Sequence, residues 1–297
     1  MVSERVAEDI FGSIILIMNK GGTMNYTGIY YFSLPENDDL ARFYENPSEF
    51  VDRLKENQYL ILENDKFEPI DFYKKRDGWL ERVSYPTFES QFCGMMKPRN
   101  PEQRCAMDLI HSDVPIKLIT GPFGSGKTFT MVEGMMEALQ KNKFEKIIFI
   151  RNNIQVKDTD ALGALPGDEL AKTLPYVMPL ADHCGGIEGL KTLIDMGRLE
   201  VIPLGFLRGR SIRNSILYSM ESENLTKEHI QLIMGRIDEG SQLWMDGDIK
   251  QRDRSSFEKS RGLEIMIERL AGNPNFGYVK LEKSERSEVA RMADLLD

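Results

Sequence analysis

One stretch of the sequence has residue types and spacing suited to binding the phosphates of a nucleotide. Residues 121–128 are Gly-Pro-Phe-Gly-Ser-Gly-Lys-Thr. Its three glycines would let the backbone wrap closely around a phosphate with its N–H groups pointing inward. Lys127 would reach the β- and γ-phosphates, and the Thr128 hydroxyl would bind Mg²⁺. The predicted phosphate-binding residues are Gly121, Pro122, Phe123, Gly124, Ser125, Gly126, Lys127 and Thr128.

The residues on either side provide the elements that such a loop needs. An apolar run at 116–120 precedes it and a helix-like run at 129–139 follows it. A strand, a glycine-rich turn and a helix form the context of a phosphate-binding loop, which a chance glycine-rich turn with a surface lysine would lack. We therefore predict that the chain binds a nucleoside triphosphate.

Beyond residue 116 the apolar runs alternate with helix-like stretches, which predicts an α/β fold with a parallel sheet flanked by helices. The predicted strands are 116–120, 146–150, 199–202, 215–219, 242–246 and 278–281. Ligands of such sheets bind beyond the carboxyl ends of the strands. Polar residues at other strand ends are then further candidates: Arg151, Glu221 and the run 247–251, which contains Asp248 and Gln251.

A helix that follows a proline-rich turn at 97–101 presents Gln103 in its first turn. An amide offers both a donor and an acceptor, so Gln103 could bind the edge of an adenine. It could equally satisfy the amino end of its own helix. The two interpretations stay open on these residues alone.

Residues 1–90 differ in pattern from residues 91–297, so we expect a small N-terminal α+β module followed by the nucleotide-binding domain. The expected elements of the module are a helix from Val6 to Ile17, strands at 27–34, 58–62 and 67–73, and short helices at 38–44 and 47–54. The module contains no evident catalytic constellation. We interpret it as a docking or oligomerisation unit.

The net charge of −9 argues against a broad basic surface that would bind nucleic acid non-specifically, although it allows a local basic groove. Two groups of basic residues, 208–213 and 250–254, could contact an RNA backbone or a neighbour's nucleotide. They could also form salt bridges with Asp246, Asp248 and Asp253.

Cys93, Cys105 and Cys184 are widely spaced and form no metal pattern with the three histidines, so we expect buried thiols in a reducing compartment. The longest apolar window, 10–18, is too short to cross a bilayer and has no secretion-type flanks. We therefore expect a cytoplasmic protein with no membrane partner.

Several separated motifs together resemble the PhoH family of ATPases, P-loop proteins related to superfamily-1 helicases. The motifs are 97–103, 121–128, 162–168, 175–176 with Asp182, 203–210, 221–226, 247–251 and 285–287. The resemblance covers about residues 90–297. It implies a RecA-like P-loop NTPase that binds ATP and Mg²⁺, assembles as a homo-oligomeric hexameric ring and acts on single-stranded RNA.

Residues 57–100 also resemble the linker region of a longer branch, whose members carry an N-terminal PIN ribonuclease domain. The segment 28–40 resembles at best the tail of that domain, and the residues before it are too few for a PIN fold with its acidic cluster. On this basis we expect no intact PIN domain and no nuclease activity.

The resemblance also implies roles for single residues. Gln103 would contact adenine, and Gln251 would sense the γ-phosphate with Asp248 beside it. Arg286 is similar to an arginine that reaches a nucleotide across a subunit interface, where it would stabilise charge on the transferring phosphoryl group. The alternative for Arg286 is a surface arginine in the charged run 283–288.

One position departs from the family pattern. Members have Asp-Glu after the strand at 216–219, where the aspartate holds Mg²⁺ and the glutamate orients water, but this chain has Met220-Glu221. Methionine is a poor ligand for a hard cation. Two hypotheses follow: an ATPase that acts on RNA, with Lys127, Glu221, Gln251 and Arg286 as catalytic residues, or a nucleotide-loaded assembly switch with little hydrolysis. A small-molecule kinase is a weaker third, since no acceptor site is evident.

Overall fold

The computed structural model describes residues 26–33, 37–90, 94–151, 177–250 and 261–285. Its centre is a sheet of six parallel strands in the order β12-β7-β11-β10-β8-β9. The strands are β7 (Ile116–Thr120), β8 (Lys146–Arg151), β9 (Leu199–Pro203), β10 (Ser215–Ser219), β11 (Gln242–Gly247) and β12 (Phe276–Lys280). All six lie where the sequence predicts them. One strand, β11, separates β7 from β10.

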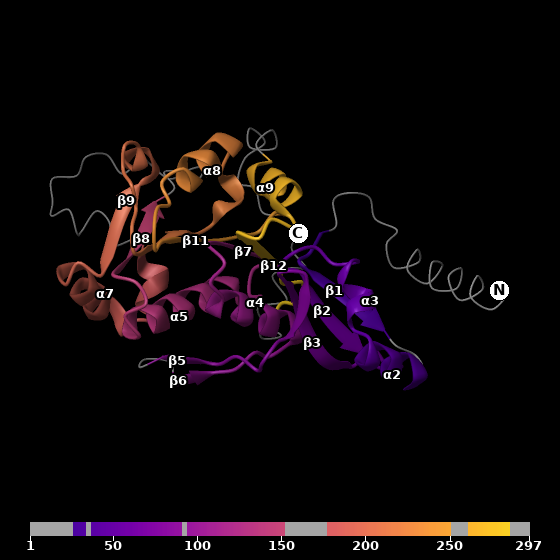
Figure 1. Ribbon diagram of the computed structural model, residues 1–297. Helices are drawn as coiled ribbons and strands as arrows, with labels where there is room; N and C mark the ends of the chain where they lie inside the picture. The colour runs from indigo at the N-terminus through magenta and orange to yellow at the C-terminus, as the bar shows by residue number, and fades with distance from the viewer. Residues whose placement is uncertain (1–25, 34–36, 91–93, 152–176, 251–260, 286–297) are drawn as a thin grey trace.

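Helices cover both faces of this sheet (Figure 1). On one face lie α4 (Pro101–His111), α5 (Lys127–Gln140) and α7 (Gly186–Asp195), and on the other α8 (Lys227–Met234) and α9 (Gly262–Leu270). Short 3₁₀ helices, η1 (Leu204–Leu207) and η2 (Ser222–Asn224), follow β9 and β10. The strands are apolar on both sides, as parallel strands buried on two faces must be. Tyr218 and Trp244 belong to the core on the α5 face, and Leu217 and Met245 to the core on the α8 face.

The N-terminal module is a four-stranded sheet in the order β1-β2-β3-β4. Its elements are β1 (Ile29–Ser33), α2 (Asn37–Glu45), α3 (Ser48–Val51), β2 (Tyr59–Glu63), β3 (Pro69–Arg76) and β4 (Trp79–Arg82). The predicted strands and short helices of this module are therefore confirmed in place. The predicted helix from Val6 to Ile17 lies outside the described residues. A short hairpin, β5 (Phe88–Ser90) with β6 (Gly94–Met96), was not predicted.

The small sheet packs onto the large one through α4. Tyr59 and Phe72 are buried in the same hydrophobic cluster as Leu109 of α4. The Asp108 carboxylate, also on α4, accepts hydrogen bonds from the Tyr59 hydroxyl (2.8 Å) and from Nζ of Lys74 (2.8 Å). Residues from both sequence regions thus share one core.

This docking gives a first prediction. Asp108→Ala would leave Lys74, whose side chain is only 8% exposed, without its counter-charge. We expect the free energy of unfolding to fall by about 2–4 kcal/mol, because removing one partner of a buried ion pair strands the other. Urea denaturation followed by circular dichroism measures the loss.

Asp65→Ala is the control, since Asp65 is an exposed aspartate in the turn between β2 and β3. Its effect should stay within about 0.5 kcal/mol. A loss for Asp108→Ala no larger than that of the control would show that the ion pair does not hold the two sheets together.

Candidate nucleotide site

The phosphate loop lies at the carboxyl edge of the large sheet, between β7 and α5. The Gly121 N–H donates to the carbonyl of Gly247 (3.1 Å), and the Leu281 N–H donates to the carbonyl of Thr120 (2.7 Å), so strands on both sides hold the base of the loop. A Cβ at position 121 would lie 2.6 Å from the Leu281 carbonyl oxygen, so this position admits only glycine without a shift. Gly126 caps α5 with φ +88°, a left-handed conformation that glycine adopts readily.

The residues of the loop fit a bound phosphate with a hard cation. Ser125 is fully buried, and its hydroxyl oxygen has no hydrogen-bond partner among the described residues. Nζ of Lys127 makes one long hydrogen bond, to the Pro122 carbonyl (3.4 Å), and stays partly exposed. The first turn of α5 also presents N–H groups that have no partner within the helix. Loop, lysine and helix end together form an anion site.

Gln103 reaches the phosphate loop from the first turn of α4. Its Nε2 donates to the Ser125 carbonyl (3.0 Å), and its Oε1 accepts the N–H of Arg99 (2.9 Å). The amino end of the helix is capped by Asn100, whose Oδ1 accepts the Gln103 N–H (2.8 Å). The Gln103 side chain is therefore a support of the loop rather than a cap. An amide has a second N–H and a second lone pair, so its contact with adenine stays a prediction.

The segment that leaves β12, residues 281–285, lies against the phosphate loop. The Glu285 N–H donates to the Gly124 carbonyl (3.0 Å) and the Ser284 hydroxyl to the Phe123 carbonyl (3.3 Å). Glu102 of α4 accepts the Glu282 N–H (2.6 Å). Arg286 and Gln251 lie outside the described residues, so their roles stay predictions. The motif residues 175–176 also lie outside them.

The end of β10 places Glu221 in a strained turn. Glu221 has φ +50° and ψ +50°, a left-handed conformation that costs a residue with a side chain about 1–2 kcal/mol. Its side chain is exposed, whereas Met220 beside it packs against the core on the α5 face. Strained backbone of this kind often marks a functional site. The water-orienting role of Glu221 stays a prediction.

A residue that the sequence did not single out for this site, Asp246 of β11, lies at its centre. Its side chain is fully buried. Oδ2 accepts the Tyr218 hydroxyl (2.8 Å), and Oδ1 accepts the Glu221 N–H (3.0 Å). The nearby Thr128 hydroxyl lowers the pKa of this carboxylate. Burial raises the pKa of Asp246, while these hydrogen bonds and the charge of Lys127 oppose the rise. The sequence suggested Asp246 only as a partner for nearby basic residues.

Glu223 and Asp248 form the other acidic part of the site. Oε2 of Glu223 accepts the Asp248 N–H (3.1 Å), and a Cβ on Gly247 would lie only 2.8 Å from the same oxygen. Burial raises the pKa of Glu223 to about 7. Asp248 is buried and accepts the Lys250 N–H (3.0 Å), so its side chain closes the turn that follows β11. Its contact with nucleotide stays a prediction.

The basic residues after β9 have other carboxylate partners than the sequence suggested. Arg210 pairs with Glu200 (2.7 Å) and Arg213 with Asp238 (2.9 Å). Arg208 is exposed beside Phe206, which is 72% exposed.

The cysteines of the described residues are buried thiols. Cys105 and Cys184 are free and buried as predicted, and Cys93 lies outside the described residues. The described residues contain no group of three or more His, Cys, Asp or Glu that could hold a metal on its own. No helix of the described ranges is long and apolar enough to cross a membrane.

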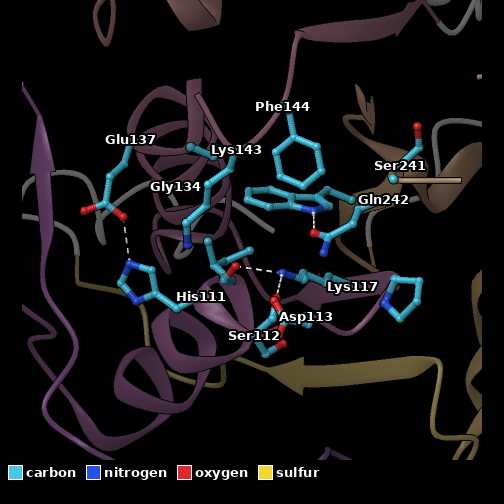
Figure 2. Close-up of a pocket in the computed structure, with 15 residues that line it drawn as sticks. His111, Ser112, Asp113, Lys117, Gly134, Glu137, Lys143, Phe144, Ser241 and Gln242 are labelled. Atoms are coloured by element: carbon cyan, nitrogen blue, oxygen red, sulfur yellow. Dashed lines mark hydrogen bonds and ion pairs between the residues drawn. The ribbon is translucent and has the colours of Figure 1, made fainter. Parts of the chain in front are cut away.

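A cavity of about 480 Å³ opens at the opposite, amino end of the strands (Figure 2). Lys117, which is 1% exposed, donates from Nζ to the carbonyls of Ile110 (2.7 Å) and Ser112 (2.6 Å) and lies 4.8 Å from the centre of the Trp244 ring. Burial holds the pKa of Lys117 well below its usual value. These carbonyls end α4, where a positive charge is stabilising. Lys117 thus ties α4 to the sheet.

The strand order and the phosphate loop define this domain as a RecA-like P-loop NTPase fold. Residues 95–294 match the family described as PhoH-like protein. The chain belongs to that family.

Individual relatives agree. The chain is 31% identical over 221 residues to Protein PhoH2 of Bacillus subtilis, which covers 70% of this chain and 49% of the relative. It is 32% identical over 202 residues to Protein PhoH2 of Mycolicibacterium smegmatis, covering 66% of this chain and 46% of the relative. A PhoH-like protein of Synechocystis is 33% identical over 148 residues, 49% of this chain and 44% of the relative. The chain spans about half the length of the curated relatives it matches.

The raised pKa of Glu223 predicts a pH dependence of stability. Because the pKa of Glu223 in the folded state, about 7, exceeds the usual 4.5, its contribution to the free energy of unfolding is complete below pH 4.5 and is lost as the pH rises through about 7. Between pH 4.5 and 8, the free energy of unfolding of the parent protein should therefore fall by about 1–3 kcal/mol more than that of Glu223→Gln. Thermal or urea unfolding of both proteins across this range measures the difference.

Glu239→Gln, a change at an exposed glutamate, is the control and should follow the parent protein at every pH. If Glu223→Gln and the parent differ by the same amount at pH 5 and pH 8, Glu223 does not titrate in this range.

Proposed function

We propose that this chain is a Mg²⁺-dependent ATPase. The observation that carries the proposal is the phosphate loop at one strand end with an acidic residue, Glu221, held at the end of another. Lys127 binds and neutralises the β- and γ-phosphates, and the Thr128 hydroxyl holds the cation. When bound, Mg²⁺ would neutralise charge on the phosphate oxygens. Glu221 orients the attacking water, and Gln251 and Arg286 take the sensing and charge-stabilising roles that the family resemblance implies.

The proposed assembly is a homo-oligomeric ring, a hexamer by resemblance, in which a neighbouring subunit covers each nucleotide. Exposed aromatic side chains beside the phosphate loop support it. Phe123 is 61% exposed and Phe129 is 40% exposed. Apolar rings gathered at a binding site are typical of surfaces that another protein covers. Light scattering with Mg²⁺ and ATP, compared with nucleotide-free protein, tests the assembly.

The proposed substrate of the motor is single-stranded RNA. Phe206 and Arg208 support it, since both are exposed and lie near the carboxyl end of the edge strand β9. A base can stack on an aromatic ring while a guanidinium contacts the backbone. The net negative charge favours such a local contact over a broad basic surface.

A second candidate, a nucleotide-loaded switch that turns over little ATP, is favoured by one observation. Met220 occupies the position after β10 where the resemblance expects an aspartate. If no other acid serves the site, nucleotide binding survives while hydrolysis is slow.

Steady-state release of phosphate from ATP with Mg²⁺ tests the proposal, measured with and without single-stranded RNA. Lys127→Ala should lower kcat at least about 100-fold, because it removes a positive charge from the transferring phosphoryl group. Lys66→Ala, in an exposed turn of the N-terminal module, is the control and should leave the rate unchanged.

Turnover well above that of Lys127→Ala, with stimulation by RNA, supports the motor. Turnover without stimulation supports the ATPase and contradicts the action on RNA. Tight binding of ATP with release no faster than in Lys127→Ala contradicts the ATPase and leaves the switch.

A further inference from the structure

We infer that Asp246, at the end of β11, supplies the carboxylate of the cation site that Met220 at the end of β10 cannot supply. The inference rests on the proposed binding of Mg²⁺ with a nucleotide and names the residue that would complete that site.

The strand register places the two residues at the same level of the sheet. Ser219 of β10 pairs with Met245 of β11, so the next residues along the strands, Met220 and Asp246, are neighbours. On its other side Asp246 pairs with Ile119 of β7, the strand that leads into the phosphate loop. An acid on β11 is therefore one strand closer to that loop than an acid on β10 would be.

The side chain of Asp246 also lies on the required face. Side chains alternate along a strand, so Asp246 is on the same face as Trp244, which belongs to the core beside α5. The Thr128 hydroxyl, in the first turn of α5, lies close enough to the Asp246 carboxylate to lower its pKa. A hydroxyl and a carboxylate that lie near each other are hard oxygen donors of the kind that Mg²⁺ prefers, with nucleotide oxygens and waters as the remaining ligands.

The charge of this carboxylate has no full counterpart within the described residues. Asp246 is 0% exposed, and its hydrogen-bond donors, the Tyr218 hydroxyl and the Glu221 N–H, are neutral. The positive charge of Lys127 lowers the pKa of Asp246, but within the described ranges Lys127 forms no salt bridge with it. A buried carboxylate is costly unless it is paired with a cation or a metal. A divalent ion beside Thr128 would provide that charge.

The same carboxylate positions Glu221. Its Oδ1 accepts the Glu221 N–H at 3.0 Å, which holds the left-handed turn that carries this side chain out of the core. Asp246 would thus serve the cation site and also position the water-orienting residue. A purely structural aspartate would do only the second, so the experiment has to measure the first.

Titrating a fluorescent ATP analogue into the full chain, with Mg²⁺ and with EDTA, measures the metal-dependent part of nucleotide affinity. Asp246→Asn keeps an oxygen for Tyr218 and removes the charge. It should lose at least about tenfold of the Mg²⁺-dependent gain and leave the affinity in EDTA unchanged. Tyr218→Phe is the matched control, because it removes a hydrogen bond to Asp246 but keeps the carboxylate, and it should retain the gain.

The double variant Met220→Asp/Asp246→Asn returns an acid to the end of β10 and should recover the Mg²⁺-dependent gain. It also serves if Asp246→Asn fails to fold, a point that circular dichroism decides. An undiminished gain in Asp246→Asn, or equal loss in Tyr218→Phe, overturns the inference. A parent protein that binds no nucleotide in either buffer instead overturns the proposed function.

Discussion

A buried carboxylate has to be satisfied by the groups around it, and the one on Asp246 sets the arrangement of this site. It has no contact with solvent, accepts hydrogen bonds from Tyr218 and Glu221, and lies near Thr128. These three residues belong to β10, to the turn after it and to the start of α5. Moving either donor away would leave a charged oxygen without a partner, which costs more than an ordinary hydrogen bond contributes. The elements of the proposed nucleotide and cation site are connected to one another through this single group.

The phosphate loop is supported from outside in a similar way. Gln103 holds the carbonyl of Ser125 from α4, and Glu285 holds the carbonyl of Gly124 from the segment after β12. These bonds to its carbonyl groups hold the loop in place before a ligand binds. Such a loop is preorganised, so that little conformational entropy is lost when an anion binds. α4 in turn carries Asp108, to which the N-terminal module is attached, so the support of the loop extends into the smaller sheet.

Much of the fold could be predicted from the sequence because it depends on local patterns. The glycine spacing at 121–126 and six apolar runs placed the loop and every strand of the large sheet. The β5–β6 hairpin was missed, since three-residue strands are too short to show alternation. Asp246 was missed for another reason. Its neighbour Met220 is 26 positions away in the chain, and only the order and register of parallel strands bring the two together.

The neighbouring ends of β10 and β11 have a consequence for how such proteins evolve and are recognised. The register places the two positions side by side. Under the proposed role of Asp246, an acid can therefore pass from one strand to the other through a sequence that carries both, without a step at which the carboxylate is absent. A motif search that inspects only the position of Met220 would class this chain as a degenerate enzyme. To decide whether such a chain carries the acid, the residues at the ends of both neighbouring strands, β10 and β11, have to be inspected.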